Sequence, residues 1–398
     1  MSDHSMIEFG PLVEHVFDDM IDVRRDLHRH PELSNAEHRT SAVITERLAS
    51  AGWDVQRCPT STGAVALLET GRPGRTVMVR ADIDALPLRE ERSEPFRSMR
   101  DDAMHACGRD VHTAGVLGVA QLLAQRHDEL CGRFMVVFQP AEEGFGGAQA
   151  MIDGGLFAAV RPDAIIGAHV TSLGPVGLVA SRPGIIMSGA DGFAFHLTGA
   201  GGHGAMASAE GNVVLAVSHL APRLPGLVEN FHYEGVACAC SAGVVQAGTA
   251  NNVVPRHAAV HGTLRTFTEQ QRSDGRASLL ALAHETESLV GVEVDLRFTG
   301  HTACVKNDPN VNESVEASAR RVVGDDMVWR IPPASPSDDM SVFLSEVPGA
   351  YIFIGGAMAD GSSGMHHSPD FAIDDAALPV FARVLATAAV DLAQPMRN

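Results

Sequence analysis

The chain has 398 residues, and its 30 Lys and Arg against 49 Asp and Glu give a formal net charge of −19. This length favours two domains over a single core. The acidic balance argues against nucleic acid as a partner and against docking on an anionic membrane, because both need a basic face. No apolar run approaches the ~20 residues of a membrane span, and the first ten residues, MSDHSMIEFG, show no secretory signal. We therefore expect a cytoplasmic protein.

In the first part of the chain, predicted helices alternate with predicted strands. Apolar positions at helical spacing indicate the helices, and short apolar runs indicate buried strands. Alternation of this kind indicates a mostly parallel sheet covered by helices, an α/β fold. The predicted elements are helices over 13–29, 36–51 and 112–126 and strands at 76–80, 134–139 and 164–170.

The pattern changes after Pro183 and returns at about Gly300. The segment between them reads as a β-α-β-β-α-β unit, which is a domain in itself. We therefore predict an α/β domain formed by 1–187 and 301–398, interrupted by an α+β domain at 188–300. The predicted elements of the insert are strands at 192–198, 236–245, 257–266 and 292–298 and helices over 212–224 and 270–290. In the part of the first domain that follows the insert, we predict a helix over 312–323, a strand at 350–354 and a helix over 376–393.

Polar side chains follow directly after the strands of the first domain. Asp82 and Asp84 follow one strand, Glu142 and Glu143 follow the next, and His169 ends a third. In open α/β sheets, sites form beyond the carboxyl ends of the strands. We therefore expect these side chains to meet at one rim.

Two loops add sulfur and imidazole to the same rim. One is MHACGRDVH at 104–112, which contains Cys107, and the other is MHHSP at 365–369. Cys, His and Glu together are ligands for zinc or a similar borderline ion. The six cysteines are too sparse in this chain for a disulfide scaffold, which leaves Cys107 free for such a role.

The adjacent Glu142 and Glu143 are the most informative pair. At a strand end both can face one crevice, so that one carboxylate binds metal while the other acts as a general base on metal-bound water. Two solvated charges are the simpler interpretation of such a pair, but the preceding buried strand FMVVFQ and the following glycines weaken it.

Taken singly, each candidate has a simpler interpretation. Cys107 fits a buried thiol, His169 a satisfied polar residue, and His366 and His367 surface histidines. Asp110 stands before a helix, and we expect it to act mainly as the N-cap. The recurrence of polar residues at strand ends favours a site.

Several long motifs resemble the metal-dependent amidohydrolases of the aminoacylase type. This family includes N-acyl-amino-acid amidohydrolases, hippurate hydrolases and plant hydrolases of auxin–amino-acid conjugates. The resemblance spans nearly the whole chain, and it implies a catalytic domain with two metal ions and an inserted lid domain that often dimerises. The motifs, in order, are LHRHPELSNAEHRT (27–40), RADIDALP, MHACGRDVHT, FQPAEEGFGGAQAMIDGG, GAHV, GAGGHGAMAS, NNVVP, GTLRT and HHSPDFAIDDAALP.

The resemblance implies roles for individual residues. Cys107 would bridge the two ions, Glu143 and His367 would complete one metal site, and His169 would belong to the other. His366 is the alternative if the motif is displaced by one residue. The remaining implied residues are Glu142 as general base, Asp84 as acidic support, His203 at the oxyanion, and Asn252 and Arg265 at the substrate or its carboxylate.

The chain departs from the family motif at one position that matters. The family has Cys-Gly-His-Asp, whose His binds the second ion, whereas this chain has Cys107-Gly108-Arg109-Asp110. Arginine is always protonated and has no lone pair to offer a metal. Either one ion remains, held by Cys107, Glu143 and His367, or the guanidinium takes the second ion's place and pairs with Glu142 or a substrate carboxylate. A third outcome has His105, His112 or Asp82 as replacement ligand, and a fourth is loss of activity. A second, milder departure is Met206-Ala207 in GGHGAMAS, where the family usually has a proline.

We therefore predict metal-dependent hydrolysis of the amide bond of an N-acyl amino acid or a similar small conjugate, in a homodimer formed through the lid. The cofactor is one or two divalent ions (Zn, Mn, Co or Ni). Two alternatives stay open. One is a metal-poor homologue that binds an acylated ligand or catalyses a different biosynthetic step, and the other is nucleophilic catalysis by Cys107.

Overall fold

The computed structural model describes residues 7–144 and 146–395. The chain divides into two compact units, of which the first comprises Met1–Gly184, Lys306–Ile331 and Asp339–Asn398. The second comprises Ile185–Val305 and Pro332–Asp338. Residues 1–6, which begin the N-terminal segment predicted to lack a secretory signal, lie outside the described residues.

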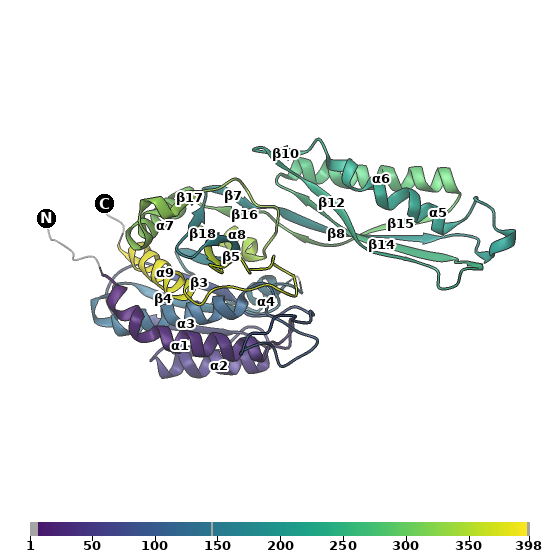
Figure 1. Ribbon diagram of the computed structural model, residues 1–398. Helices are drawn as coiled ribbons and strands as arrows, with labels where there is room; N and C mark the ends of the chain where they lie inside the picture. The colour runs from purple at the N-terminus through teal and green to yellow at the C-terminus, as the bar shows by residue number, and fades with distance from the viewer. Residues whose placement is uncertain (1–6, 145, 396–398) are drawn as a thin grey trace. The chain divides into compact units, whose positions relative to one another are not determined.

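The first unit is built on an eight-stranded sheet (Figure 1). Its strands in spatial order are β1 (Asp54–Gln56), β2 (Ala64–Glu69), β4 (Arg133–Gln139), β3 (Thr76–Asp82), β5 (Ala164–Pro175), β18 (Gly349–Ala357), β6 (Val179–Ser181) and β17 (Val328–Arg330). The central pairs β4–β3, β3–β5 and β5–β18 are parallel, as is β6–β17. The predicted α/β fold with a mostly parallel sheet is confirmed.

Helices cover both faces of this sheet. The helices of the unit are α1 (Gly10–Arg29), α2 (His38–Ser50), α3 (Arg109–Gln125), α4 (Gly147–Asp153), α7 (Pro309–Val323), α8 (Met340–Glu346) and α9 (Ala377–Ala393), with short 3-10 helices η1 (His127–Glu129) and η5 (Asp325–Met327). Val77 and Val79 of β3 lie in the large apolar core, where α3 and α9 contact the strand. Arg80 follows Val79 on the same strand, but its side chain donates to Asp339 at the start of α8 (3.1 Å). Because side chains alternate across a strand, α8 lies on the face opposite α3 and α9.

The second unit is an α+β unit with its own core. Its antiparallel sheet has the order β12 (Ala239–Ala247), β14 (His257–Thr266), β8 (Gly189–Thr198) and β15 (Glu293–Thr302). Helices α5 (Val213–Leu220) and α6 (Glu269–Val290) pack on it and bury a cluster that includes Phe195, Leu264 and Leu279. Its short elements are β9 (Gly202–His203), η2 (Gly204–Met206), η3 (Ala221–Arg223), η4 (Pro225–Val228), β10 (His232–Tyr233), β11 (Val236–Ala237) and β13 (Val253–Val254). Two short strands, β7 (Gly184–Met187) and β16 (Val305–Asn307), cross the boundaries between the two units.

Two predicted elements of this unit were wrong in extent. The helix predicted to reach 224 ends at Leu220 and continues as the 3-10 helix η3, because Pro222 has no amide hydrogen for the α-helical hydrogen bond. The strand predicted over 236–245 is two strands: β11 forms a hairpin with β10, whereas β12 pairs with β14. Cys238 lies between them and donates its amide to the carbonyl of Phe231 (2.8 Å).

Neither membrane spans nor disulfides occur in the described part of the chain. No helix within these ranges is both long and apolar enough to cross a membrane. The six cysteines are free thiols.

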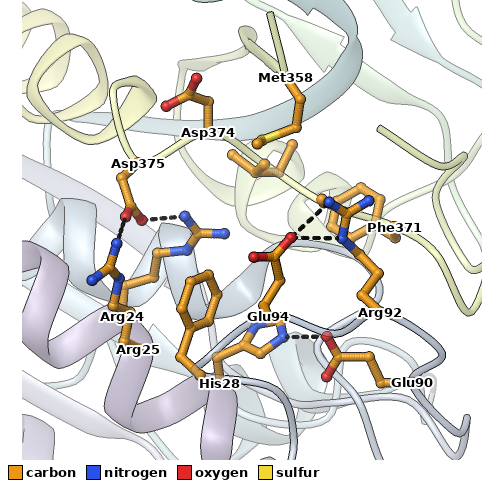
Figure 2. A pocket seen from close by; sticks show the side chains of 13 residues that line it. Arg24, Arg25, His28, Glu90, Arg92, Glu94, Met358, Phe371, Asp374 and Asp375 are labelled. Carbon is orange, nitrogen blue, oxygen red and sulfur yellow. Dashed lines mark hydrogen bonds and ion pairs between the residues drawn. The ribbon is translucent and has the colours of Figure 1, made fainter. Parts of the chain in front are cut away.

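A buried ionic network ties α1 to α3 and replaces the cap that we predicted. The N-cap of α3 is Gly108, so the expectation that Asp110 caps this helix was wrong. Asp110 instead accepts hydrogen bonds from His28 Nδ1 (2.9 Å) and Arg24 Nε (3.2 Å). Figure 2 shows the adjoining cavity, of about 170 Å³, in which Arg24 also reaches Asp375 and His28 reaches Glu90 (3.3 Å).

This network holds His28 in its protonated form. Burial by itself lowers the pKa of His28, but the carboxylates of Asp110 and Glu90 outweigh it and raise the pKa from 6.5 to about 9. The neighbouring His105 ring, 6.4 Å away between centroids, is held neutral because burial lowers its pKa to about 4. A pKa raised on folding stabilises the native state below the unfolded pKa, and this contribution is lost as pH rises towards the folded pKa.

We therefore expect the stability of the protein to fall between pH 6.5 and 9 through His28. Over this pH range the free energy of unfolding of the wild type should fall by about 3 kcal/mol more than that of His28→Gln, because Gln retains the shape of the side chain without its charge. Denaturant unfolding at several pH values measures it. His15→Gln, on the exposed side of the same helix, is the control and should follow the wild type. Parallel pH profiles for wild type and His28→Gln would contradict the assignment.

Candidate active site at the strand ends

The polar residues predicted to meet at one rim do converge there. Because β3, β4 and β5 are parallel neighbours, their carboxyl ends lie at the same edge of the sheet. Asp82, Asp84 and Glu142 are buried at the ends of β3 and β4. His169 is buried within β5, and the expectation that it ends its strand was wrong, because β5 continues to Pro175 beside β18. The start of α3 brings Cys107 and Arg109 to the same place.

Arg109 binds three of these carboxylates at once. Its Nε donates to Asp82 Oδ2 (2.8 Å), its Nη1 to Glu143 and its Nη2 to Glu142. Only 2% of Arg109 is exposed. Burial lowers the pKa of this guanidinium, but the surrounding charges, Glu143 first, raise the pKa well above its ordinary range. Arg109 is therefore a permanent cation at the centre of the acidic residues.

Asp82 is held in its ionised form by the charges around it. Burial raises its pKa, but Arg80, His112 and Arg109 together hold the pKa well below its usual range. His112 is fully engaged: its Nδ1 donates to Asp82 (2.7 Å), and its Nε2 accepts the amide of Val170 (3.0 Å). Both ring nitrogens of His112 are thus engaged, and each oxygen of Asp82 already accepts one hydrogen bond. His105, the third alternative, has both ring nitrogens buried without a hydrogen-bond partner.

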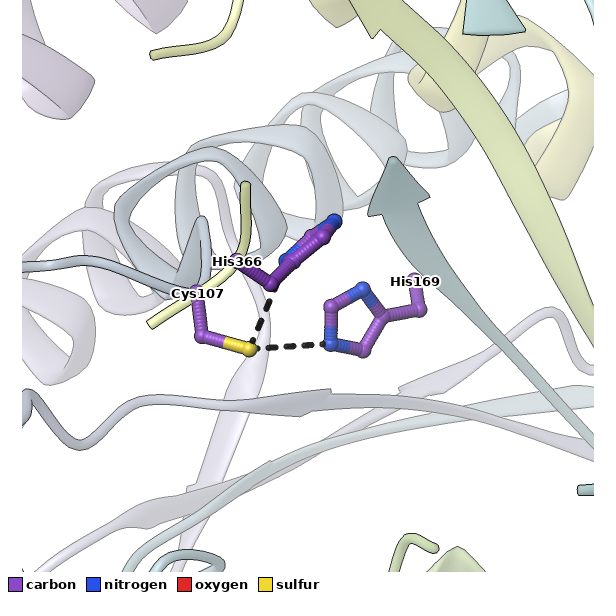
Figure 3. A group of neighbouring side chains, drawn as sticks. All are labelled: Cys107, His169 and His366. Atoms are coloured by element: carbon purple, nitrogen blue, oxygen red, sulfur yellow. Dashed lines mark hydrogen bonds between the residues drawn. The ribbon is translucent and has the colours of Figure 1, made fainter. Parts of the chain in front are cut away.

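Cys107 lies against two histidines (Figure 3). Its Sγ is 3.4 Å from His169 Nε2 and 3.7 Å from His366 Nδ1, and the three atoms lie within 4.8 Å of one another. His169 Nδ1 donates to the carbonyl of Val170 (2.6 Å), which leaves the lone pair on Nε2. Burial and the neighbouring His112 and His366 hold the pKa of His169 well below its usual range. His169 is thus a neutral imidazole whose lone pair points at the sulfur.

A second group shares the same sulfur. Cys107, Glu143 and His367 also present ligand atoms within 4.8 Å of one another, with His367 Nε2 3.1 Å from Glu143 Oε1. His367 is exposed, and its backbone has a positive φ of 62°. The structure thus brings both histidines of the HHSP segment to Cys107, each in a different group.

The Cys107 thiol is not activated for nucleophilic attack. Burial raises its pKa well above the ordinary value, and the charge of Arg109, which lowers it, is offset by those of Glu143 and Glu142. The thiol is therefore protonated at neutral pH without a metal, which disfavours the nucleophilic alternative.

Asp84 supports the site by holding the backbone of Glu143. Its Oδ2 accepts the Glu143 amide (3.0 Å) and the hydroxyl of Ser34 (2.7 Å). Burial raises the pKa of Asp84, and Arg109 opposes this. Residue-by-residue reasoning did not single out Ser34, although it lies inside the LHRHPELSNAEHRT motif.

Three predicted site residues belong to the second unit. His203 ends β9, is exposed, and its Nδ1 accepts the amide of Ala205 (3.1 Å). Asn252 is exposed, and its carbonyl accepts the amide of Gly204 (2.8 Å). Arg265 lies on β14 and donates to Ser337 Oγ (3.2 Å).

Comparisons with known proteins agree with this architecture. The chain matches peptidase family M20/M25/M40 over residues 78–391 and belongs to that family. It is 33% identical to the N-acetylcysteine deacetylase of Bacillus subtilis, covering 93% of this chain and 96% of that protein. It is 39% identical to an N-acyl-L-amino acid amidohydrolase of Geobacillus stearothermophilus, covering 67% and 71%.

A solved structure shares nearly the whole fold. It is the Bacillus subtilis YxeP protein, described as a dinuclear metal binding peptidase of the M20 family, with a TM-score of 0.79 at 29% identity over 96% of this chain and 99% of that one. The predicted family is thus confirmed, and with it the prediction of an enzyme of the amidohydrolase class.

Gly108 makes the turn that places Cys107 and Arg109. Its φ is +81°, and an added Cβ would lie 2.4 Å from Val170 Cγ2. Gly52 has the matching φ of +82° with nothing within 4 Å of such a Cβ. We expect Gly108→Ala to lose about 2 to 3 kcal/mol and Gly52→Ala about 1 kcal/mol, because only the first adds a clash to the backbone strain. Denaturant unfolding measures both, and equal losses would show that contact with Val170 is unimportant.

Proposed function

We propose that this chain is a metal-dependent amidohydrolase that cleaves the amide bond of an N-acyl amino acid or a similar small conjugate. The observation that carries the proposal is the meeting of Cys107, His169 and the Glu142–Glu143 pair at one sheet edge. It is supported by relatives named as deacetylases and amidohydrolases of N-acyl amino acids.

The chemistry of the donor atoms fits a divalent ion. A buried sulfur, a neutral imidazole with a free lone pair and nearby carboxylates are ligands for Zn, Mn, Co or Ni. The family resemblance implies ligands from Cys107, Glu143, His169 and His367, and the structure adds His366 as a further donor beside Cys107. When bound, such an ion acts as a Lewis acid on the amide carbonyl and lowers the pKa of water.

Glu142 is the general base in this proposal. It takes a proton from the water that attacks the acyl carbon, and it returns that proton to the amine as the carbon–nitrogen bond breaks. Only 7% of Glu142 is exposed, and the Arg109 guanidinium beside it favours the ionised carboxylate. Asp84 positions the neighbouring Glu143 through its amide.

The second unit supplies the remaining proposed roles. His203 helps to hold the oxyanion, and Asn252 and Arg265 bind the substrate or its carboxylate. Arg109 is a further candidate for that carboxylate. These roles, dimerisation through the second unit and a cytoplasmic location follow from the family resemblance and the sequence, and they stay predictions.

One observation favours a second candidate function. Arg109 stands where the family motif has a metal-binding histidine, and its guanidinium is bound to the acidic residues. A metal-poor homologue that binds an acylated ligand, or catalyses a different biosynthetic step, is the alternative. It requires that purified protein hold little metal and that added Zn, Mn or Co restore no hydrolysis.

Replacement of Glu142 tests the hydrolytic proposal. Glu142→Gln keeps the size of the side chain but removes the proton acceptor, so kcat should fall by at least about 100-fold. The assay is release of free amine from a panel of N-acetyl and N-benzoyl amino acids with Mn, Zn or Co present. Glu46→Gln, on an exposed part of α2, is the control and should keep full activity. Circular dichroism confirms that both variants fold, and unchanged kcat in Glu142→Gln would exclude it as the base.

A further inference from the structure

The Arg109 guanidinium occupies the position of a cation among the carboxylates at the ends of β3 and β4. Its three nitrogens donate to three different acids, Asp82, Glu142 and Glu143. The Arg109 and Asp82 side chains are 3% and 0% exposed. Arg109 therefore already places one positive charge among these three acids.

A divalent ion cannot share this position with Arg109. It would have to break buried, charge-assisted hydrogen bonds, and it would then lie beside a positive charge in a poorly solvated place. The guanidinium cannot relieve the repulsion by losing a proton or by offering a lone pair. The residues at this position do not fit an ion.

The group formed by Cys107, His169 and His366 has no such conflict with Arg109. The hydrogen bonds of Cys107, His169 and His366 run among themselves and to the backbone of Val170 and Ser172. His366 Nε2 accepts the Ser172 amide at 3.4 Å. Coordination through Nδ1 would move the ring proton to Nε2 and cost only this long hydrogen bond.

The group of Cys107, Glu143 and His367 fits an ion less well. Its carboxylate is bound by Arg109, so an ion there would have to break that ion pair. Its histidine is exposed, whereas Cys107 and His169 are buried. Buried sulfur and nitrogen donors give up little hydration when they bind a metal.

We propose that each chain binds a single divalent ion through Cys107, His169 and His366, and that the Arg109 guanidinium permanently replaces a second ion between Asp82, Glu142 and Glu143. The inference rests on the proposed metal dependence but not on hydrolysis. It makes Arg109 a structural cation that also positions Glu142.

Cobalt binding tests the count and the ligands together. Full-length protein is freed of metal, dialysed against Co²⁺ and analysed for cobalt per chain by mass spectrometry. We expect one ion per chain and a thiolate-to-cobalt charge-transfer band, because Cys107 is a ligand. His366→Ala should weaken binding by at least about tenfold, while its neighbour His367→Ala should bind as the wild type does. The opposite ranking of these two variants, or two ions per wild-type chain, would overturn the proposal.

Replacement of Arg109 tests the excluded site. Arg109→His supplies a neutral donor to the same acids and should bind a second cobalt ion. Arg109→Ala leaves the acids without a cation, so Co²⁺ should raise its melting temperature more than that of the wild type. This second variant keeps the test valid if Arg109→His folds poorly. One ion in Arg109→His together with equal cobalt-induced stabilisation of Arg109→Ala and the wild type would refute the role of Arg109.

A matched control excludes non-specific effects of removing a buried arginine. Arg24 is also buried between two carboxylates, those of Asp110 and Asp375, outside the Cys107 site. Arg24→His should leave the count at one ion, and a second ion there would count against a special role for Arg109.

The cobalt count needs no substrate. One bound ion without amide hydrolysis would therefore refute the proposed activity while supporting the single-ion site, and hydrolysis with two ions would do the reverse.

Discussion

The buried ionic contact between Arg109 and three carboxylates is the constraint on which the rest of the site depends. Asp82, Glu142 and Glu143 lie together because parallel strands end at one edge, and like charges so placed repel one another. Removing one partner of such a buried cluster typically costs about 3 to 5 kcal/mol, because the remaining charges are left without compensation. The geometry of the strand ends therefore requires a cation, and this chain provides it as a side chain.

The fold delivers that cation through one turn. Gly108 adopts the left-handed conformation immediately before α3, so the residues on either side of it point to different parts of the site. Cys107 reaches the histidines, while Arg109 reaches the acids. Cys107 and Arg109 are thus only two positions apart in sequence, and the absence of a side chain at Gly108 leaves the space that Val170 of β5 occupies.

Much of this arrangement was predictable from the sequence, for physical reasons that also explain the failures. Strand ends and their polar residues could be found because buried parallel strands read as short apolar runs. The placement of His366 and His367 in different groups around Cys107 could not be predicted, because adjacent residues in a loop have no periodicity that shows which way each side chain points. Asp110 was mistaken for a cap because its partners, His28 and Arg24, lie more than 80 residues away. The end of α5 at Leu220 was signalled by Pro222, and that signal was given too little weight.

The charge of Arg109 bears on both components of the proposed reaction. It excludes an ion from the acids, which confines the Lewis acid to the thiol and imidazole donors. It also donates to Glu142, the proposed base, and so fixes the position of that carboxylate. A histidine at this position can lose its proton and offer a lone pair to a metal ion, which an arginine cannot do. The arginine therefore gives a site whose fixed charge changes neither with pH nor with the supply of metal.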